Sequence, residues 1–423
     1  MMGVTVAFWL ALAAAMYPWL IYPLLLAARA RRRAPVPAPT SWASAPTSWA
    51  SAPTSWPFLS VIIAAYNEAA CIRAKLASAL EADYPRDRIE VIVVSDASSD
   101  ATDRLVVEYD DPRVTLVRQE PRAGKSPALN RGVALSRGDV LVFTDANATF
   151  APGALGRLAA PFADPRVGLV SGHGLYTMSG GAGGTGPERA SGTGPAPRDA
   201  GAVANGYVRF EAFLRSREAS LGVLAGADGA IYALRRTLYR DLGPAEVNDL
   251  AHAIETAVAG YAACFDPRAY TVEPPSTDAR QEFRRHVRIV AQNARLIQNW
   301  LPRIVGAARF RLLWALVSHR ILRWLTGPAL AIALGANVLL LGSHRVYTFT
   351  LAGQSVFYAQ ALAGLVAERA GRRLGRAALP YYFCVVGMAG LAGLARYLRG
   401  GAQAVWAPTG QPAREPRVPE RAA

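Results

Sequence analysis

Three apolar runs in the first half of the chain each end in a polar cluster. Residues 61–65, 91–95 and 140–144 have the composition of strands, and helical patterns separate them between Phe58 and about Gly172. This alternation is typical of βαβ units and a parallel sheet. Because the carboxyl ends of parallel strands line one crevice, we expect the three polar clusters to meet there. The sequence therefore predicts an α/β domain with a ligand site at this edge.

The polar clusters contain the residue types that hold a divalent cation and a phosphorylated ligand. Tyr66 and Glu68 follow the first run, Asp96 follows the second, and Asp145 with Asn147 follow the third. Mg²⁺ and Mn²⁺ prefer oxygen ligands and commonly share them with substrate phosphates. Asp-x-Asn alone is common in ordinary turns. Its place beside two other polar strand ends is what favours a functional interpretation.

Lysine is rare in this chain, where 44 of the 46 basic residues are arginine. Lys125 lies at the predicted start of a helix, where its compact ammonium suits a phosphate contact. The surrounding sequence from Arg122 to Ser126 is not a P-loop, because the first glycine and its spacing are missing. The other lysine, Lys75, is expected on a solvated helix face.

Two further acidic residues follow in the second half of this region. Asp228 lies in a predicted tight turn before a short strand, and Asp249 opens a helical stretch that ends near Gly260. A carboxylate in the position of Asp249 has two interpretations. It caps the helix, or it acts as a general base that accepts a proton from an attacking hydroxyl.

Apolar segments at both ends of the chain predict a membrane protein. Hydrophobic residues make up 52% of the sequence, and the mean hydropathy is +0.15. Residues 4–28 are long enough to span a bilayer, and the arginines that follow at 29–33 place the next segment in the cytoplasm. We expect an uncleaved anchor at the inner membrane with its amino terminus outside and the α/β domain cytoplasmic.

The last third of the chain adds an interfacial helix at 309–324 and about three spans. The predicted spans are 325–342, 347–367 and 379–398. Four crossings agree with a cytoplasmic basic loop at 368–376, but they place the arginine-containing tail, residues 399–423, outside. Because this conflicts with the positive-inside rule, the prediction contains a miscounted span.

Two segments of biased composition interrupt the predicted domain organisation. Residues 34–57 form a linker with repeats of Pro-Thr-Ser-Trp-Ala-Ser-Ala, whose prolines exclude a continuous helix. A tether that places Trp42, Trp49 and Trp56 in the membrane interface is the alternative interpretation. Residues 179–201 are rich in glycine and are expected to form a flexible loop.

The net charge of +15 at pH 7 calls for an anionic partner. No nucleic-acid-binding motif accompanies the charge, so membrane lipids and substrate phosphates are the expected partners and nucleic acid is not. Three isolated cysteines show neither zinc-binding nor disulfide spacing.

These motifs together resemble the membrane-embedded members of glycosyltransferase family 2, which include the cellulose, hyaluronan and poly-N-acetylglucosamine synthases. The resemblance covers roughly residues 58–300. It implies a GT-A fold and an inverting hexosyl transfer from a nucleotide sugar, with a UDP-sugar as the expected donor and Mg²⁺ or Mn²⁺ as the cofactor. The implied acceptor is a polysaccharide or a lipid-linked sugar.

The resemblance also assigns roles to individual residues. Tyr66, Glu68, Asp96, Lys125 and Asp145 correspond to nucleotide-binding positions, Asp145 and Asn147 to metal ligands, Asp249 to the catalytic base, and Asp228 and Arg288 to the acceptor and diphosphate site.

The sequence departs from the family pattern in two places. Asn248 replaces the glutamate before the base, and residues 284–289 lack the tryptophan of the Gln-x-x-Arg-Trp motif, which puts processivity in doubt. A catalytically silent homologue that binds nucleotide or scaffolds a synthase complex is the alternative. A soluble-type nucleotidyltransferase fits the sheet but not the membrane spans.

Overall fold

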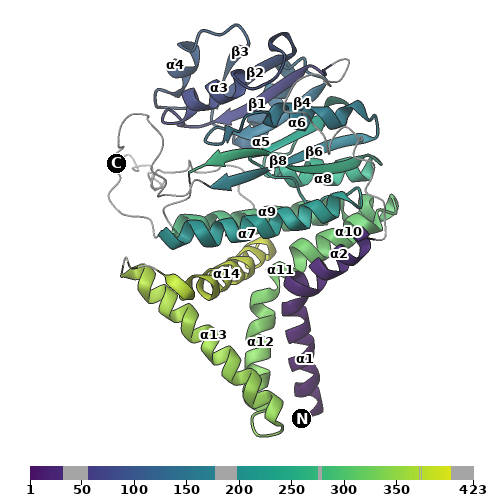
Figure 1. The fold of residues 1–423 in the computed structure, drawn as a ribbon, viewed down its shortest axis with the longest axis vertical. Coiled ribbons are helices and arrows are strands. Elements are labelled where there is room, and N and C mark those ends of the chain that lie inside the picture. The colour runs from purple at the N-terminus through teal and green to yellow at the C-terminus, as the bar shows by residue number, and fades with distance from the viewer. Residues whose placement is uncertain (32–55, 177–197, 275–278, 371, 373, 402–423) are drawn as a thin grey trace, which may run out of the picture.

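An eight-stranded sheet domain lies on a layer of long helices, from which apolar helices extend away (Figure 1). The computed structural model describes residues 1–31, 56–176, 198–274, 279–370, 372 and 374–401. The amino terminus lies at the far end of the apolar helices, and the turn between α12 (Thr326–Leu339) and α13 (Arg345–Arg369) lies at the same end.

The sheet has the strand order β3-β2-β1-β4-β7-β6-β8-β5. Its strands are β1 Leu59–Ala65, β2 Ile89–Asp96, β3 Val114–Gln119, β4 Val140–Asp145, β5 Thr149–Phe150, β6 Val167–Tyr176, β7 Ile231–Arg235 and β8 Ala262–Glu273. Strands β3, β2, β1 and β4 are parallel, and β7 is antiparallel to both of its neighbours. The prediction of a mostly parallel α/β sheet is confirmed.

Helices cover both faces of the parallel half, which explains why β1 and β2 consist of buried residues throughout. The helices of this domain are α3 Ile72–Leu80, α4 Thr102–Val107, α5 Lys125–Leu135, α6 Ala154–Ala159 and α8 Asn248–Val258, with short 3₁₀ turns η3 Arg86–Arg88, η4 Ala160–Ala163 and η5 Arg236–Leu238. Helix α5 approaches the sheet closely at Gly132. A Cβ there would lie 2.7 Å from Ile62 Cγ2 and 3.1 Å from Val94 Cγ2.

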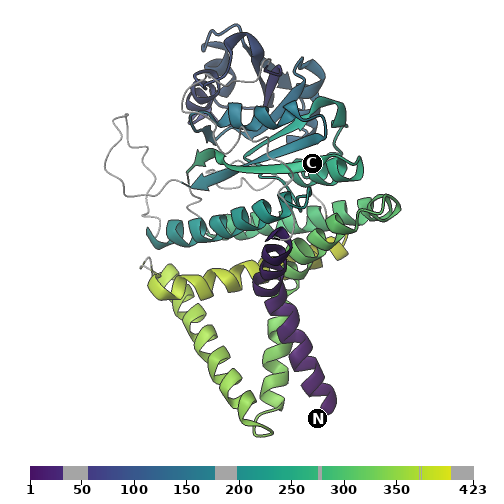
Figure 2. The same cartoon turned by 45° about the vertical axis from the view of Figure 1, so that its right-hand side comes forward.

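Two long helices, α7 (Arg198–Ala219) and α9 (Ala279–Gly306), lie between the sheet and the apolar helices (Figures 1 and 2). The apolar helices are α1 Met2–Met16, η1 Tyr17–Ile21, α2 Tyr22–Arg31, α10 Phe310–Leu316, η6 Val317–Ile321, α11 Leu322–Trp324, α12, α13, the 3₁₀ turn η7 Gly375–Ala377 and α14 Ala378–Leu398. Three of the described helical segments, Met2–Arg29, Arg345–Arg369 and Ala378–Leu398, are long and apolar enough to cross a membrane.

The predicted interfacial helix at 309–324 is not regular. It contains a π-helical turn, η6, and it meets α12 at an angle of 57°. Together these two helices are apolar and long enough for one bent span. The predicted span at 325–342 is shorter than expected, because α12 ends at Leu339.

Helix α14 runs across the other apolar helices, beneath α7 and α9 (Figures 1 and 2). Glycines permit its close contacts: a Cβ at Gly393 would lie 2.5 Å from Val290 Cβ, and one at Gly387 would lie 3.4 Å from Gly327 Cα. Its most apolar stretch is 39% buried, compared with 11% for α13. Helix α14 thus packs against the protein more than the other candidate spans do.

Several predicted segments lie outside the described residues. These are the linker up to residue 55 with Trp42 and Trp49, the glycine-rich segment up to residue 197, and the tail from residue 402. The predicted loop end at residue 201 is wrong, because α7 begins at Arg198. Trp56 packs edge-on against Tyr84 of the sheet domain, with ring centroids 5.1 Å apart.

Candidate functional site

The carboxyl ends of β1, β2 and β4 meet at one edge of the sheet, as their parallel register requires. Ala64 pairs with Asp145 across β1 and β4, and Ala65 pairs with Ser95 across β1 and β2. The residues after these pairs therefore leave the sheet side by side. This register brings Asp96 and Asp145, from separate parts of the sequence, to the same edge.

Tyr66 and Glu68 lie in the turn after β1. The Arg122 guanidinium lies 3.5 Å above the Tyr66 ring, and Glu68 Oε2 accepts a hydrogen bond from Cys71 Sγ at 3.1 Å. Burial raises the pKa of Glu68 to about 7, and the Asp145 carboxylate contributes to the rise. The Asp145 carboxylate therefore disfavours the ionised form of Glu68, an effect that a bound cation would oppose.

Asp96 is completely buried, and its carboxylate holds the loop before α5. Its Oδ1 accepts hydrogen bonds from Gln119 Nε2 at 2.7 Å and from the Ala123 N–H at 2.8 Å. Its Oδ2 accepts one from the Gly124 N–H at 3.0 Å. Both oxygens thus bond the protein and fix the backbone just before Lys125. A direct bond from Asp96 to a nucleotide stays a prediction.

Lys125 and Asp145 form an ion pair at the sheet edge. The distance from Lys125 Nζ to Asp145 Oδ1 is 2.5 Å, and the two side chains are 29% and 34% exposed. Asn147 follows in the turn after β4 and is partly exposed. A carboxylate and an amide at an accessible strand end suit a hard divalent cation that also binds phosphate oxygens.

The prediction that Lys75 lies on a solvated helix face is wrong. Lys75 is completely buried, because α3 turns it toward the sheet and beneath the Asp145 turn. Its Nζ donates to Thr144 Oγ1 at 2.6 Å and to the Ala148 carbonyl oxygen. Burial lowers the pKa of Lys75, while the nearby Asp145 carboxylate raises it.

Asp249 lies in the first turn of α8 and is partly exposed. It does not cap the helix: the cap position is Val247, and Asp249 Oδ1 accepts from the next backbone N–H, that of Leu250, at 2.7 Å. Removal from water raises the pKa of Asp249, and the charges of Arg320 and Lys125 lower it. The carboxylate is thus accessible for a proton transfer, and burial and the two nearby positive charges together set its pKa.

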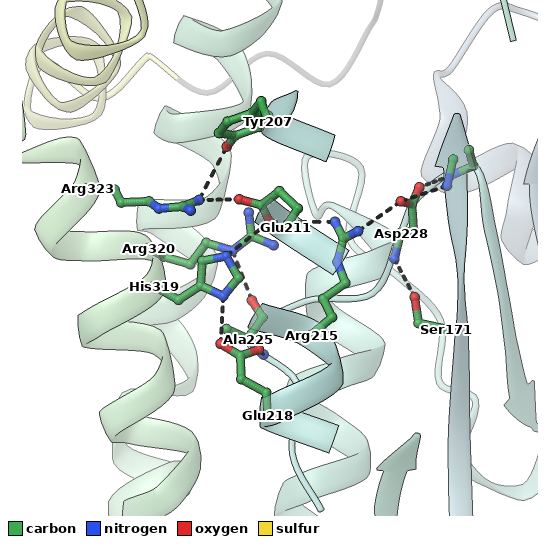
Figure 3. Close-up of polar contacts among 12 residues, drawn as sticks. Ser171, Tyr207, Glu211, Arg215, Glu218, Ala225, Asp228, His319, Arg320 and Arg323 are labelled. Atoms are coloured by element: carbon green, nitrogen blue, oxygen red, sulfur yellow. Dashed lines mark hydrogen bonds and ion pairs between the residues drawn. The ribbon is translucent and has the colours of Figure 1, made fainter. Parts of the chain in front are cut away.

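Asp228, predicted in the acceptor and diphosphate site, is held by the protein. Its Oδ2 accepts from Arg215 at 3.0 Å and from the Gly174 N–H at 3.1 Å, and its Oδ1 accepts from the Ala230 N–H at 3.2 Å (Figure 3). The carboxylate therefore fixes the turn between Ala225 and Ala230. A Cβ at Gly229 in this turn would lie 3.3 Å from Asp249 Oδ2, so the turn forms one wall of the Asp249 environment.

Arg288, on α9, lies near the donor side of the site. Its guanidinium donates to Gln292 Oε1 at 3.3 Å. Burial lowers its pKa, as do Arg285 and Arg396, whereas Asp145 raises it. This electrostatic contact with Asp145 is compatible with the predicted diphosphate role, which stays a prediction.

A buried network of charged side chains was missed in the sequence. His319 lies 2.7 Å from Glu218 and 3.1 Å from Glu211, and Glu211 also pairs with Arg323 (Figure 3). Tyr22 donates to Glu218 at 2.8 Å. The network joins α2, α7, η6 and α11. Its signal was present as basic residues within an otherwise apolar segment, 309–324, which we interpreted as an interfacial helix.

The network reaches the turn beside Asp249 at Ala225, whose N–H donates to Glu218 Oε2 at 3.0 Å and whose carbonyl accepts from Arg320 Nε at 3.0 Å (Figure 3). Asn248, which departs from the family pattern, points into the core of the sheet domain. It is buried and donates to Tyr232 Oη at 2.7 Å, and Tyr232 also bonds His252 Nδ1 at 2.9 Å. Asn248 and His252 therefore belong to the core beneath the site.

Comparison with known proteins shows what the sheet domain is similar to. Residues 60–220 match the profile of "Glycosyl transferase family 2". This match covers less than half of the chain and shows similarity to that family over the region that contains Tyr66, Asp96 and Asp145. The mannosyltransferase PcManGT from Pyrobaculum calidifontis, solved in complex with GDP-Man and Mn²⁺, is 25% identical with a TM-score of 0.62, and the match covers 93% of this chain and 99% of that one. The GT-A fold that the sequence predicts is confirmed.

Two curated relatives match a shorter part of the chain. The probable glycosyltransferase YdaM of Bacillus subtilis is 43% identical over 98 residues, which cover 22% of this chain and 23% of that protein. The β-monoglucosyldiacylglycerol synthase of Trichormus variabilis is 37% identical over 119 residues, or 27% and 25% of the two chains. The matched region thus spans about a quarter of each relative's length.

Proposed function

We propose that this chain transfers a sugar from a nucleotide-sugar donor to a hydroxyl group of a membrane-associated acceptor, with inversion at the anomeric carbon. One observation carries the proposal: Lys125 connects the two halves of the site. Its ammonium contacts Asp145 at the sheet edge, and its charge also lowers the pKa of Asp249. The predicted donor-binding carboxylate and the predicted base therefore both interact electrostatically with one cation.

In this proposal Asp249 accepts the proton of the acceptor hydroxyl. The hydroxyl oxygen then forms a bond to the anomeric carbon as the bond to the nucleotide diphosphate breaks, and the attack from the opposite side inverts the configuration. Lys125 and Arg288 stabilise the negative charge that develops on the departing diphosphate. Tyr66, Glu68 and Asp96 shape the nucleotide side of the crevice.

The residues at the sheet edge fit a divalent cation only together with a ligand. Among the described residues, no group of three or more His, Cys, Asp or Glu side chains is placed to hold a metal. Asp145 and Asn147 offer part of a shell of oxygen ligands, which the diphosphate would complete. A bound Mg²⁺ or Mn²⁺ would supply charge neutralisation at the diphosphate. Its binding is therefore expected to depend on the nucleotide.

The proposed donor is a nucleotide sugar, and the proposed acceptor is a lipid-linked sugar or a polysaccharide. PcManGT binds GDP-Man with Mn²⁺, so GDP-mannose is a candidate donor beside the UDP-sugars that the motifs suggest. A lipid-linked acceptor agrees with the apolar helices below the site and with the lipid product named for the Trichormus variabilis relative. A growing polysaccharide is the other acceptor class.

The orientation of α14 supports a membrane arrangement with three crossings: α1, the bent pair that ends in α12, and α13. Helix α14 then lies in the cytoplasmic interface beneath α9, and the basic tail stays in the cytoplasm with the sheet domain. This arrangement removes the conflict between four crossings and the charge rule.

A donor panel tests the proposed function. Purified chain in lipid vesicles is given UDP- and GDP-sugars with Mn²⁺, and nucleotide release is measured for the wild type and for Asp145→Asn. We expect release from at least one donor, loss of release with a chelator, and a higher Mn²⁺ requirement in the variant. Release from no donor, with every acceptor class supplied, would sink the enzyme proposal and favour a nucleotide-binding scaffold.

A further inference from the structure

Both lysines of this chain converge on the turn that carries Asp145. Lys125 contacts the Asp145 carboxylate from the accessible side, and Lys75 contacts the backbone and a side chain of the same turn from the core. The other 44 basic residues are arginine. A chain that uses arginine almost everywhere thus has lysine at both positions beside this turn.

The Lys75 ammonium has an acceptor for each of its three hydrogens. Thr144 Oγ1 lies at 2.6 Å, the Ala148 carbonyl accepts a second bond, and the Phe150 ring face lies 3.6 Å away. The Thr144 hydroxyl donates its own proton to the Ala230 carbonyl at 2.7 Å, so it accepts from Lys75. An ammonium places three donors on one atom, whereas a guanidinium spreads five over a plane. The site therefore suits lysine and not arginine.

The Thr144 hydroxyl extends this contact to the second half of the site. Its acceptor, Ala230, ends the turn that begins at Ala225, and Gly229 in that turn packs beside the Asp249 carboxylate. One buried ammonium thus supports the turn of the predicted donor site and, through a single hydroxyl, the wall of the predicted base.

We propose that Lys75 is a positioning residue that fixes the turn from Thr144 to Ala148, so that Asp145 and Asn147 face the donor diphosphate and its metal. The identity of the ligand rests on the proposed function, whereas the order of the turn does not. Removing the ammonium leaves the Ala148 carbonyl without this donor in a buried place, which favours a rearranged turn.

Lys75→Met tests the proposal because methionine keeps most of the side-chain length and removes the charge. Arg73→Met on the same helix is the matched control, since the Arg73 side chain is 50% exposed. Two quantities are measured: hydrogen–deuterium exchange of residues 144–150, and Mn²⁺ affinity in the presence of GDP or UDP. We expect faster exchange in Lys75→Met and Mn²⁺ affinity about tenfold or more weaker, as for other residues that support a metal ligand. Arg73→Met should change neither.

Folded Lys75→Met protein with wild-type exchange in this turn and wild-type Mn²⁺ affinity would overturn the proposal. If Lys75→Met does not fold, Thr144→Val removes the acceptor of the same bond at nearly constant volume and is expected to change both readouts in the same direction. Wild-type exchange and wild-type Mn²⁺ affinity in Thr144→Val would also contradict the proposal. Neither measurement requires turnover. If the wild-type chain transfers no sugar, the proposed function is rejected, and the exchange and Mn²⁺-affinity measurements still test the role of Lys75.

Discussion

At the scale of single residues, the site depends on how the protein controls the charge of its carboxylates. Removal from water raises the pKa of Asp249, and the positive charges of Arg320 and Lys125 lower it. A general base must be ionised, so activity is expected to fall as the pH drops through this pKa. The position of that acidic limb therefore reports the environment of Asp249.

Arg320→Gln should move the acidic limb of the pH–rate profile to higher pH. The variant removes a positive charge that favours the ionised form of Asp249, so the carboxylate takes up its proton at a higher pH. The profile of kcat is measured beside Arg311→Gln, an exposed arginine on the adjacent helix. An acidic limb that stays in place in Arg320→Gln, or moves equally in the control, contradicts the assignment of Asp249 as the base.

Sequence patterns were most informative where a residue follows a strand. The positions of Asp96 and Asp145 at one sheet edge follow from the parallel register alone. The environment of Lys75 could not be predicted in this way, because which face of a short helix meets the sheet depends on packing with distant strands. The same applies to Asp228, whose carboxylate accepts from Arg215 of α7 and from the Gly174 N–H of β6, on the other side of the glycine-rich segment.

At the scale of elements, close helix–sheet contact depends on glycine at particular positions. Gly132 lets α5 pack against β1 and β2, while Gly206 in α7 has no atom within 4 Å of a Cβ built on it. Both residues lie within helices. Both glycines therefore have a helical backbone, but only Gly132 lacks space for a side chain.

Gly132→Ala should destabilise the chain by about 1–3 kcal/mol, because the added methyl group overpacks the contact with Ile62 and Val94. Gly206→Ala, the control, should leave the free energy of unfolding unchanged or raise it by up to about 1 kcal/mol through helix propensity. Denaturant unfolding in detergent measures both. Equal effects of the two substitutions are incompatible with the described packing of α5.

Hydropathy identified the apolar helices but not their directions. The segment at 378–398 has the length and composition of a span, yet it runs crosswise under α9, which it meets at Gly393, and it meets α12 at Gly387. Composition contains no information on this orientation, which depends on where small residues let two backbones approach. The π turn in η6 was equally invisible, since its residues have ordinary helical composition.

At the scale of the whole molecule, the buried network of Figure 3 joins the membrane-proximal helices to the turn beside Asp249. Its members come from α7, η6, α11 and the turn before β7, and Tyr22 of α2 donates to Glu218. Such buried charges are costly to separate once paired. The network therefore holds the sheet domain in a defined place above the apolar helices.

The three-crossing arrangement predicts which side of the membrane each end of α14 occupies. In a background without the native cysteines, Ser343→Cys between α12 and α13 should react with an impermeant maleimide only from outside. Arg399→Cys, just after α14, should react only from the cytoplasmic side. Labelling is compared in right-side-out and inverted vesicles. Reaction of Arg399→Cys from the outside would show that α14 crosses the membrane.

The most direct test of the account is the turnover of Asp249→Asn with the donor that the wild type accepts. The substitution keeps the shape of the side chain and removes the base, so kcat should fall by about 10²–10⁴-fold. Nucleotide affinity should stay near the wild-type value, because the donor contacts lie on the Asp145 side of the site. A variant that retains kcat within a few fold, with intact nucleotide binding, would contradict the claim that Asp249 is the catalytic base.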